Sequence, residues 1–326
     1  MIEKLLYWES PAVDPYLNLA AEEALLDRLN PGECALYLWQ NQHTVVIGRN
    51  QNAWKECEVS LLEAEGGHLA RRLSGGGAVY HDLGNLNFTF FARHQDYDVG
   101  RQLSVIIRAL AWYGARAELS GRNDLLAEGR KCSGNAFYRR GGACCHHGTL
   151  LLDADMEKLS RYLTVDPAKL AAKGVASVRS RTVNLGSLIP GLTAEDLKAK
   201  LKEAFSLVYG LPVEASPGPE AEALGRLRKK YASDKWLYGR QADFNYRFSR
   251  RFAWGDADIS LRIKDGLVED ALISSDAMEV DWTGRVEKAL LGRRFGSAPL
   301  GEALAELAEE GGIFKDIQEL IQERGI

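Results

Sequence analysis

The most informative segment of the chain reads, from residue 71 to residue 82, Arg71-Arg72-Leu73-Ser74-Gly75-Gly76-Gly77-Ala78-Val79-Tyr80-His81-Asp82. Its three consecutive glycines present backbone N–H groups that no side chain shields, and the two arginines before them supply fixed positive charge. Together these features predict a binding site for a phosphate or a carboxylate. A glycine run alone is more often a flexible turn between strands. The arginines and the polar residues after the glycines therefore carry the prediction.

This segment matches none of the common sequence motifs for nucleotide binding or for a catalytic serine. It contains no G-x-x-x-x-G-K-[ST] phosphate loop, and no G-x-G-x-x-G opens a helix here. No G-x-S-x-G surrounds Ser74. The sequence therefore does not favour a kinase, a dehydrogenase or a plain hydrolase.

The flanking sequence alternates between helix-like and strand-like patterns. Leu86, Phe88 and Phe90 alternate with polar residues, which predicts a half-buried strand. Other predicted elements are a helix that begins at Asp14-Pro15 and stops at Asn30-Pro31-Gly32, a hairpin of Ala35 to Trp39 with Thr44 to Ile47, a helix over Leu103 to Leu110, a strand over Thr149 to Leu152, and a helix from Thr193 to Tyr209. Strands and helices mix without the regular alternation of a parallel sheet, so we predict an α+β fold.

We expect two domains, a large one over residues 1–245 and a small accessory one over residues 246–326. The small domain is predicted from a hairpin around Asp265-Gly266 that is followed by two or three helices. Such a unit can bury a core of its own. Residues 214 to 220 read as a loop.

A second polar segment holds candidate charged groups. Lys131 stands between glycine-flanked turns, where a strand can deliver an ammonium group to a bound acyl-phosphate, although a lysine in a loop is usually only solvated. Asp124 could hold Mg²⁺ against phosphates or simply cap a turn. The neighbouring cysteines and histidines fit no zinc spacing, and adjacent residues on a strand point to opposite faces, so we do not predict a metal cluster there. These residues are Cys132, Cys144, Cys145, His146 and His147.

A third segment, residues 173 to 184, consists mainly of small, polar and basic residues. This composition is expected of a loop that becomes ordered over a bound nucleotide, and equally of a solvated surface loop.

Composition limits the class of protein. The 326 residues are 46% hydrophobic and 26% charged with a net charge of -4, so no global basic field favours nucleic acid or a membrane surface. Five cysteines without a regular framework favour reduced thiols, and no apolar run reaches membrane-spanning length. We expect a cytoplasmic protein.

Several motifs in order resemble the lipoate-protein ligase A family, in its two-domain bacterial form. They are R-R-x-S-G-G-G-A-V-Y-H-D-x-G-N, G-R-N-D, G-R-K-x-S-G-x-A, H-H-G-T-L-L and K-G-V-x-S-V-R-S-R, with weaker matches at N-L-A-x-E-E and T-V-V-I-G-R-x-Q-N-x-W-K-E-C. The resemblance implies a large α+β catalytic domain related to biotin-protein ligases. It also implies that lipoate and ATP give lipoyl-AMP with Mg²⁺. The lipoyl group then passes to a lysine on a lipoyl domain of a 2-oxoacid dehydrogenase acyltransferase subunit, or on the glycine-cleavage H protein.

The resemblance also implies roles for individual residues. Lys131 would be the catalytic residue and contact both the nucleotide phosphate and the lipoyl carbonyl, and Asp124 would hold the metal. The ATP contacts would be Arg72, Asn123, Asp124 and the backbone of Gly77, Ala78, Val79 and Tyr80. The lipoate contacts would be Leu73, Ser74, Gly75, Gly76, His81 and His147. The loop over the adenylate would include Ser177, Val178, Arg179 and Ser180.

Two other functions compete with this reading. A transferase that moves octanoyl or lipoyl groups between carriers without ATP would need a thiolate, for which Cys144 or Cys145 beside His146 is the available arrangement. A non-catalytic regulator would keep the ligand pocket without turnover. The residues around Lys131 disfavour both.

Overall fold

The computed structural model of the chain describes residues 1–121, 124–164, 182–239 and 244–325. The described residues cluster into two units. The first comprises Met1–Ile47, Trp54–Arg72 and Ala78–Leu237, and the second comprises Gly48–Ala53, Leu73–Gly77 and Tyr238–Ile326. Two short pieces of the N-terminal part of the chain, one of them the glycine run, thus group with the C-terminal residues.

An eight-stranded mixed sheet organises the first unit, in the order β11-β1-β2-β6-β10-β9-β8-β7. Only β1 pairs in parallel, with β11 and with β2, and the other neighbours are antiparallel. The strands are β1 (Lys4–Glu9), β2 (Glu33–Trp39), β6 (Asn85–Arg93), β7 (Ala117–Ser120), β8 (Asp124–Ala127), β9 (Arg130–Arg140), β10 (Ala143–Leu151) and β11 (Val213–Ala215). A smaller sheet, in the order β4-β3-β5, holds β3 (Thr44–Ile47), β4 (His68–Arg71) and β5 (Val79–His81).

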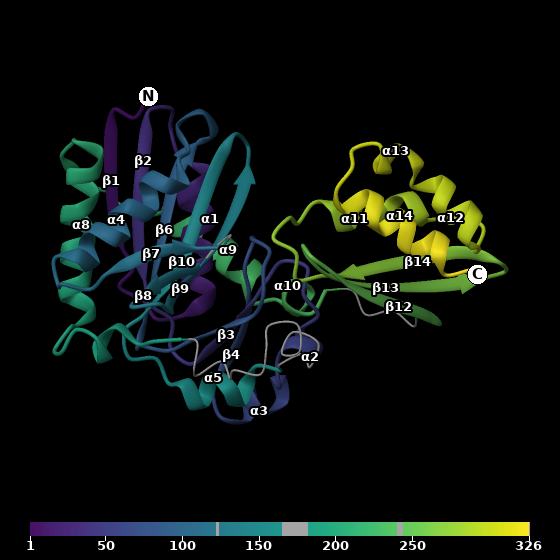
Figure 1. The fold of residues 1–326 in the computed structure, drawn as a ribbon, viewed down its shortest axis with the longest axis horizontal. Coiled ribbons are helices and arrows are strands. Elements are labelled where there is room, and N and C mark those ends of the chain that lie inside the picture. Colours follow the sequence, from purple (N-terminus) through teal and green to yellow (C-terminus); the bar gives the residue numbers. More distant parts are fainter. Residues whose placement is uncertain (122–123, 165–181, 240–243, 326) are drawn as a thin grey trace. The chain divides into compact units, whose positions relative to one another are not determined.

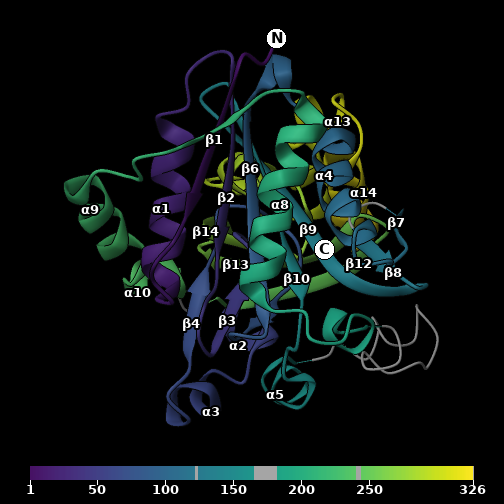
Figure 2. The same ribbon diagram turned by 90° about the vertical axis from the view of Figure 1, so that its left-hand side faces the viewer.

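Helices cover the two faces of the large sheet (Figure 1). On one face, α4 (Val99–Ala111) and α8 (Ala194–Tyr209) close a core with the apolar side chains of β1, β2, β6 and β10. On the other lies α1 (Pro15–Asp27), and α9 (Ala221–Tyr231) packs beside α1 (Figure 2). The remaining helices of more than three residues described between residues 53 and 237 are α2 (Ala53–Glu56), α3 (Val59–Ala64), α5 (Met156–Tyr162) and α10 (Asp234–Leu237).

Side-chain caps explain where the main helices begin. The Asp14 carboxylate accepts from the backbone N–H groups of Tyr16 and Leu17, with Pro15 at the first helical position of α1. Thr193 caps α8 by accepting from the N–H of Asp196, and Gly210 ends that helix in a left-handed conformation. Both predicted helices are confirmed.

A three-stranded antiparallel sheet with helices on one side forms the body of the second unit. Its elements are β12 (Tyr246–Phe252), β13 (Gly255–Lys264), β14 (Leu267–Ser274), α11 (Trp282–Leu290), α12 (Ser297–Ala303), α13 (Ala305–Ala308) and α14 (Ile313–Glu323). They share a separate hydrophobic core that includes Ile259, Trp282 and Ile317. The hairpin at Asp265-Gly266 is confirmed, and it is followed by four helices rather than two or three.

Three local predictions need correction. The strands near Ala35 and Thr44 are not a hairpin, because β2 pairs with β1 and β6 in the large sheet while β3 pairs with β4 and β5. Strand β6 is buried on both faces rather than half-buried, since α1 covers the polar face. The segment after residue 212 is not entirely loop, because Val213–Ala215 adds β11 to the sheet edge.

In the part of the chain that the structure describes, every helix is too short or too polar to cross a bilayer.

Candidate functional site

One face of the large sheet is lined with polar side chains, and the predicted site residue His147 is found there. Strand alternation sends Asn85, Asn87 and Thr89 of β6 to this face, which we call the polar face. Directly paired residues share a face, so β10 adds Thr149 opposite Asn87 and His147 opposite Thr89. The apolar residues between them enter the core against α4 and α8.

Lys131 lies on this face next to an acidic partner. Its ammonium Nζ is 2.7 Å from Oδ1 of Asp124, and the two side chains are 38% and 33% exposed. Gly134 leaves room for the lysine, because a Cβ at that position would be 3.3 Å from Nζ. Val183 N–H donates to the Lys131 carbonyl at 2.9 Å, which ties the chain after residue 181 to β9. The lysine therefore lies on strand β9, in agreement with the expectation that a strand delivers its ammonium group.

The two arginines before the glycine run have different environments. Arg71 donates from Nε and Nη2 to the carbonyl of Leu237, at 3.0 and 2.5 Å, and so fastens α10 to β4. Arg72 is 7% exposed, and its Nη1 donates to the carbonyl of Val46 at 3.1 Å. Burial lowers the pKa of Arg72 to about 10, so the guanidinium remains charged at neutral pH.

The glycine run belongs to the second unit, and each of its glycines has a different reason to be there. A Cβ on Gly75 would lie 2.2 Å from the carbonyl oxygen of Ala277, so the backbone packs too closely for a side chain. Gly76 has φ of +89° and donates its N–H to the same oxygen at 3.0 Å. Gly77 is exposed, and a Cβ there would meet open space. The expectation of three unshielded N–H donors is thus wrong at Gly76.

The residues around the glycines take ordered positions. Leu73 and Ser74 are buried in the second unit, while Ala78 precedes β5 in the first. Val79 and Tyr80 pair with β3. The Tyr80 hydroxyl is buried without a hydrogen-bond partner among the described residues.

His81, on β5 of the smaller sheet, has an almost fully buried imidazole ring. It is 3% exposed, packs edge-on against Trp39 with ring centroids 6.1 Å apart, and its Nδ1 lies 3.2 Å from Nδ2 of Asn41. Burial lowers the pKa of His81 to about 3, and the positive charge of Arg72 acts in the same direction. The ring is neutral at physiological pH.

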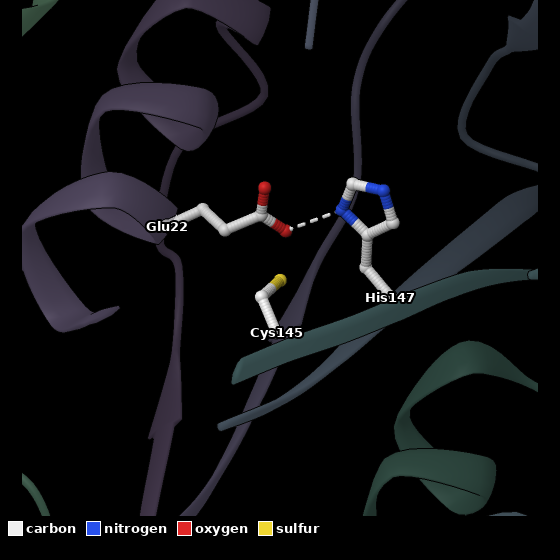
Figure 3. Close-up of side chains that lie close together, drawn as sticks. All are labelled: Glu22, Cys145 and His147. Carbon is white, nitrogen blue, oxygen red and sulfur yellow. Dashed lines mark hydrogen bonds and ion pairs between the residues drawn. The ribbon is translucent and has the colours of Figure 1, made fainter. Parts of the chain in front are cut away.

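Behind His147 lies a network that the sequence did not reveal (Figure 3). Oε1 of Glu22, from α1, accepts from Nδ1 of His147 at 2.8 Å and from the Thr89 hydroxyl at 2.7 Å. The Thr89 oxygen in turn accepts from the indole N–H of Trp39 at 3.0 Å. Because a carboxylate only accepts, Glu22 fixes the proton of His147 on Nδ1. A signal was present in the sequence, because the adjacent Glu22 and Glu23 are acidic residues within the apolar stretch of helix from Leu19 to Leu26.

Cys145 lies in this cluster with Glu22 and His147. The sequence predicted no metal-binding cluster among these cysteines and histidines, but the three side chains do come close together. The three ligand atoms lie within 4.8 Å of one another, a spacing that a metal ion could bridge. Adjacent residues do point to opposite faces as predicted, but Cys145 and His147 are two apart and share one. The Glu22 oxygen already accepts two hydrogen bonds inside the protein, so we assign the cluster to positioning His147.

Neither Cys144 nor Cys145 has the lowered pKa that is typical of an activated thiol. Burial raises the pKa of Cys144 and raises the pKa of Cys145 well above its usual range. His146 points to the opposite face, where its ring nitrogens lie 2.9 Å from the amide oxygens of Gln102 and Asn135. It cannot serve as a base for Cys145. Burial likewise raises the pKa of Cys132 to about 12.

Some predicted site residues lie outside the described part of the chain. They are Asn123, Ser177, Val178, Arg179 and Ser180.

Two protein-family patterns match the chain. The pattern described as lipoyl protein ligase A/B catalytic domain matches residues 14–206, and that described as bacterial lipoate protein ligase C-terminus matches residues 241–322. Lipoate-protein ligase A of Psychrobacter cryohalolentis is 40% identical over 297 residues, which is 88% of each chain. The protein of the same name from Bdellovibrio bacteriovorus is 37% identical over 312 residues, 93% of this chain and 92% of its own.

Solved structures agree with these matches. The structure of P. falciparum LipL1 in complex with lipoate superposes with a TM-score of 0.82 and 25% identity, over 98% of this chain and 99% of that one. The structure of a lipoate-protein ligase A bound with ATP gives a TM-score of 0.61 and 27% identity, over 73% of this chain and 99% of that one. A structure from the archaeal lipoylation system of Thermoplasma acidophilum, described as a bi-partite lipoate protein ligase and its E2 lipoyl domain, gives a TM-score of 0.63 and 27% identity, over 74% of this chain and 99% of that one. The predicted fold class is confirmed.

Proposed function

The chain belongs to the lipoate-protein ligase A family and is a ligase; on that premise we propose how its residues carry out the two half-reactions. In the first, a carboxylate oxygen of lipoate attacks the α-phosphorus of ATP, and pyrophosphate leaves. In the second, a carrier lysine attacks the acyl carbonyl of lipoyl-AMP, gives up a proton, and AMP leaves. The observation that carries the proposal is the Lys131 ammonium, which β9 holds on the polar face beside Asp124.

Lys131 is the catalytic residue of this proposal. Its ammonium contacts the lipoyl carbonyl oxygen and an α-phosphate oxygen, where negative charge increases as the acyl–phosphate bond forms. In the absence of these anions, the Asp124 carboxylate pairs with it at 2.7 Å. Arg72, charged and buried, supplies a second cation for ATP, with the backbone of Gly77, Ala78, Val79 and Tyr80. Asn123 and the loop with Ser177, Val178, Arg179 and Ser180 complete the nucleotide contacts.

Mg²⁺ fits the acidic group that is present. It is usually bound through one or two carboxylates together with substrate phosphates, and Asp124 offers one carboxylate that is a third exposed. Bound there, the ion would neutralise phosphate charge during adenylation.

The lipoate contacts of this proposal are Leu73, Ser74, Gly75, Gly76, His81 and His147. We propose that residues 1–245 act as the catalytic domain and residues 246–326 as the accessory domain. The separate core of the C-terminal helices and strands supports this division.

The acyl acceptors are lipoyl domains of 2-oxoacid dehydrogenase acyltransferase subunits and the glycine-cleavage H protein, with no role for nucleic acid or membrane. The archaeal lipoylation system, which comprises a bi-partite ligase and its E2 lipoyl domain, supports the first class. Use of ATP and five free cysteines agree with a cytoplasmic location.

Two assays test the half-reactions separately. Lipoate-dependent exchange of pyrophosphate into ATP reports adenylation, and the mass of an apo lipoyl domain incubated with ATP, Mg²⁺ and lipoate reports transfer. Exchange that does not depend on lipoate, or a carrier whose mass stays unchanged, would contradict the proposal.

The cysteine-dependent transferase is the second candidate, and the raised thiol pKa values count against it. Replacing Cys144 and Cys145 together by Ala is expected to leave ATP-dependent ligation nearly unchanged, because no thioester forms. A thioester-linked acyl group on either cysteine, detected by mass spectrometry in the unmodified protein, would establish the transferase instead.

A further inference from the structure

Three metal-ligating side chains of different kinds meet in the buried part of the first unit (Figure 3). Helix α1 supplies the Glu22 carboxylate. Strand β10 supplies the Cys145 thiol and the His147 imidazole from positions two residues apart, which share a face. The three residues are 3%, 2% and 7% exposed, in that order. One ligand atom of each lies within 4.8 Å of the other two, so a single ion could contact all three.

The Glu22 carboxylate lacks the cationic partner that a buried charge normally has. Its Oε1 accepts from Nδ1 of His147 at 2.8 Å and from the Thr89 hydroxyl at 2.7 Å. Its Oε2 has no hydrogen-bond partner among the described residues. The ion-pair partner that these residues offer is His147, which is charged only when protonated, whereas the adjacent Glu23 pairs with a lysine and an arginine. Buried charges are ordinarily paired or bound to a metal, so the environment of Glu22 indicates a cation.

The chemistry of the three groups selects the kind of cation. A thiolate, an imidazole and a carboxylate are the side-chain ligands that Zn²⁺ takes in proteins. Mg²⁺ and Ca²⁺ take oxygen ligands instead, so this cluster differs in kind from the single carboxylate of Asp124. Zn²⁺ with one thiolate and one carboxylate also has no net charge, which reduces the cost of burying the ion. Three protein ligands leave the fourth tetrahedral position to water.

We propose that Glu22, Cys145 and His147 bind one Zn²⁺ ion, at a site separate from the Mg²⁺ site at Asp124. The ion would coordinate a Glu22 oxygen, Sγ of Cys145 and Nδ1 of His147. The thiol proton would pass to solvent, and the imidazole proton would move from Nδ1 to Nε2. Burial raises the pKa of Cys145 well above its usual range, but a thiol that coordinates a metal ion loses its proton to the solvent.

Zinc bound at this site would inhibit the ligase. This consequence rests on the proposed function, in which His147 contacts lipoate. Coordination at Nδ1 replaces the hydrogen bond by which Glu22 orients the His147 ring. A ring held by the ion would no longer be placed to contact lipoate, so Zn²⁺ should weaken lipoate binding about tenfold, the usual cost of one lost hydrogen bond.

Titration calorimetry with Zn²⁺ tests the site directly, on metal-stripped protein without a polyhistidine tag. We expect one ion per chain. Cys145→Ser and Glu22→Gln should each weaken Zn²⁺ binding about 100-fold or more, because even a lost outer-shell partner costs roughly 10- to 100-fold. Co²⁺ is the spectroscopic probe, and it should give a thiolate charge-transfer band in the wild-type protein that is absent in Cys145→Ser. Either variant decides the question if the other fails to fold.

Cys144→Ser is the matched control, because Cys144 precedes Cys145 on β10 and points to the opposite face, with its Sγ 3.8 Å from Nδ1 of His94. This variant should keep the wild-type affinity for Zn²⁺ and the Co²⁺ band. A wild-type protein that binds no Zn²⁺ would overturn the inference. So would a folded Cys145→Ser or Glu22→Gln protein that binds Zn²⁺ as tightly as wild type, or a Cys144→Ser protein that loses the ion.

Lipoate titrations with and without bound Zn²⁺ test the inhibition. Zinc should weaken lipoate binding in the wild-type protein and have no effect on it in Cys145→Ser. Equal lipoate affinity of the zinc-loaded and zinc-free wild-type proteins would overturn the inhibitory role. Failure of the zinc-free wild-type protein to activate lipoate in the presence of ATP and Mg²⁺ would instead overturn the proposed function.

Discussion

The two faces of the eight-stranded sheet carry opposite chemistry on the same strands. In β6, Leu86, Phe88 and Phe90 enter the core beneath α4 and α8, while Asn85, Asn87 and Thr89 line the polar face. Both sets are almost fully buried, so exposure does not distinguish them. The difference lies in what holds each side chain: close packing on one face and hydrogen bonds on the other. Substitutions on the two faces should therefore change different properties.

The largest expected effect is on the apolar face. Phe88 is fully buried and packs against the rings of Phe90 and His146. Phe88→Ala should lower the free energy of unfolding by about 3 to 5 kcal/mol, through lost burial and the cavity that remains. Urea denaturation measures this loss. Exchange activity per folded molecule should stay close to wild type, and a selective loss of activity would contradict the separation of the faces.

The matching experiment on the polar face removes the catalytic cation. Lys131→Ala should reduce adenylation by about 10² to 10³-fold, the usual cost of losing one preorganised charged group at a reacting centre. Its stability should change little, because the side chain is 38% exposed.

Arg130→Ala is the control for this change, since Arg130 is the exposed neighbour on β9. The adenylation rate and the stability of Arg130→Ala should both stay close to those of the wild-type protein. A Lys131→Ala protein that forms lipoyl-AMP within tenfold of the wild-type rate would remove the residue from the mechanism.

Two glycines allow the same chemical change to be made on each face. A Cβ on Gly148 would lie 2.5 Å from Cζ of Phe88, so Gly148→Ala should destabilise the fold by about 1 to 3 kcal/mol. A Cβ on Gly134 would lie 3.3 Å from the end of the flexible Lys131 side chain. Gly134→Ala should therefore shift that ammonium slightly and lower adenylation on the order of 3- to 10-fold.

The two variants are compared by their melting temperatures and by their rates of pyrophosphate exchange. Gly148→Ala should mainly lower the melting temperature, and Gly134→Ala should mainly lower the exchange rate. If Gly134→Ala were the more destabilising of the two, the assignment of faces would be wrong.

A further effect concerns pH. Burial lowers the pKa of His146 to about 3, whereas an unfolded chain has a histidine pKa near 6.5. Between these values the unfolded state binds more protons, so the free energy of unfolding falls as pH decreases through this window, by up to about 1.4 kcal/mol per pH unit. Above pH 6.5 this group contributes no slope. His146→Gln should make the dependence shallower in urea titrations at several pH values.

His81 titrates in the same direction, because burial also lowers its pKa to about 3. The slope should thus be reduced in His146→Gln and not abolished. An unchanged slope would mean that His146 is already protonated in the folded protein.

Local sequence signals determined much of this protein. Caps at Asp14 and Thr193 and the periodicity of residues 103 to 110 located α1, α8 and α4, and the Asp265-Gly266 turn located the β13–β14 hairpin. The order of the motifs pointed to the family. These signals are readable because caps, turns and helical periodicity depend on residues within a few positions of one another.

Other features were decided only by the tertiary structure. Strands β2 and β3 are neighbours in sequence but joined different sheets, since strand pairing depends on distant partners. The glycine run packs against Ala277, some two hundred residues along the chain, which leaves no room for a side chain on Gly75, whereas Gly76 has φ of +89°. Glu22 meets His147 only because α1 crosses the sheet at that strand.

Alternation in β6 was visible in the sequence, but the burial of both of its faces was not. Whether a polar residue on a strand faces solvent or a buried site depends on what covers that face, and here the cover is a helix from the start of the chain. The sequence by itself therefore determined which residue types alternate. Only the fold decided that Asn87 and His81 would be almost fully buried, because burial is set by residues far away in the chain.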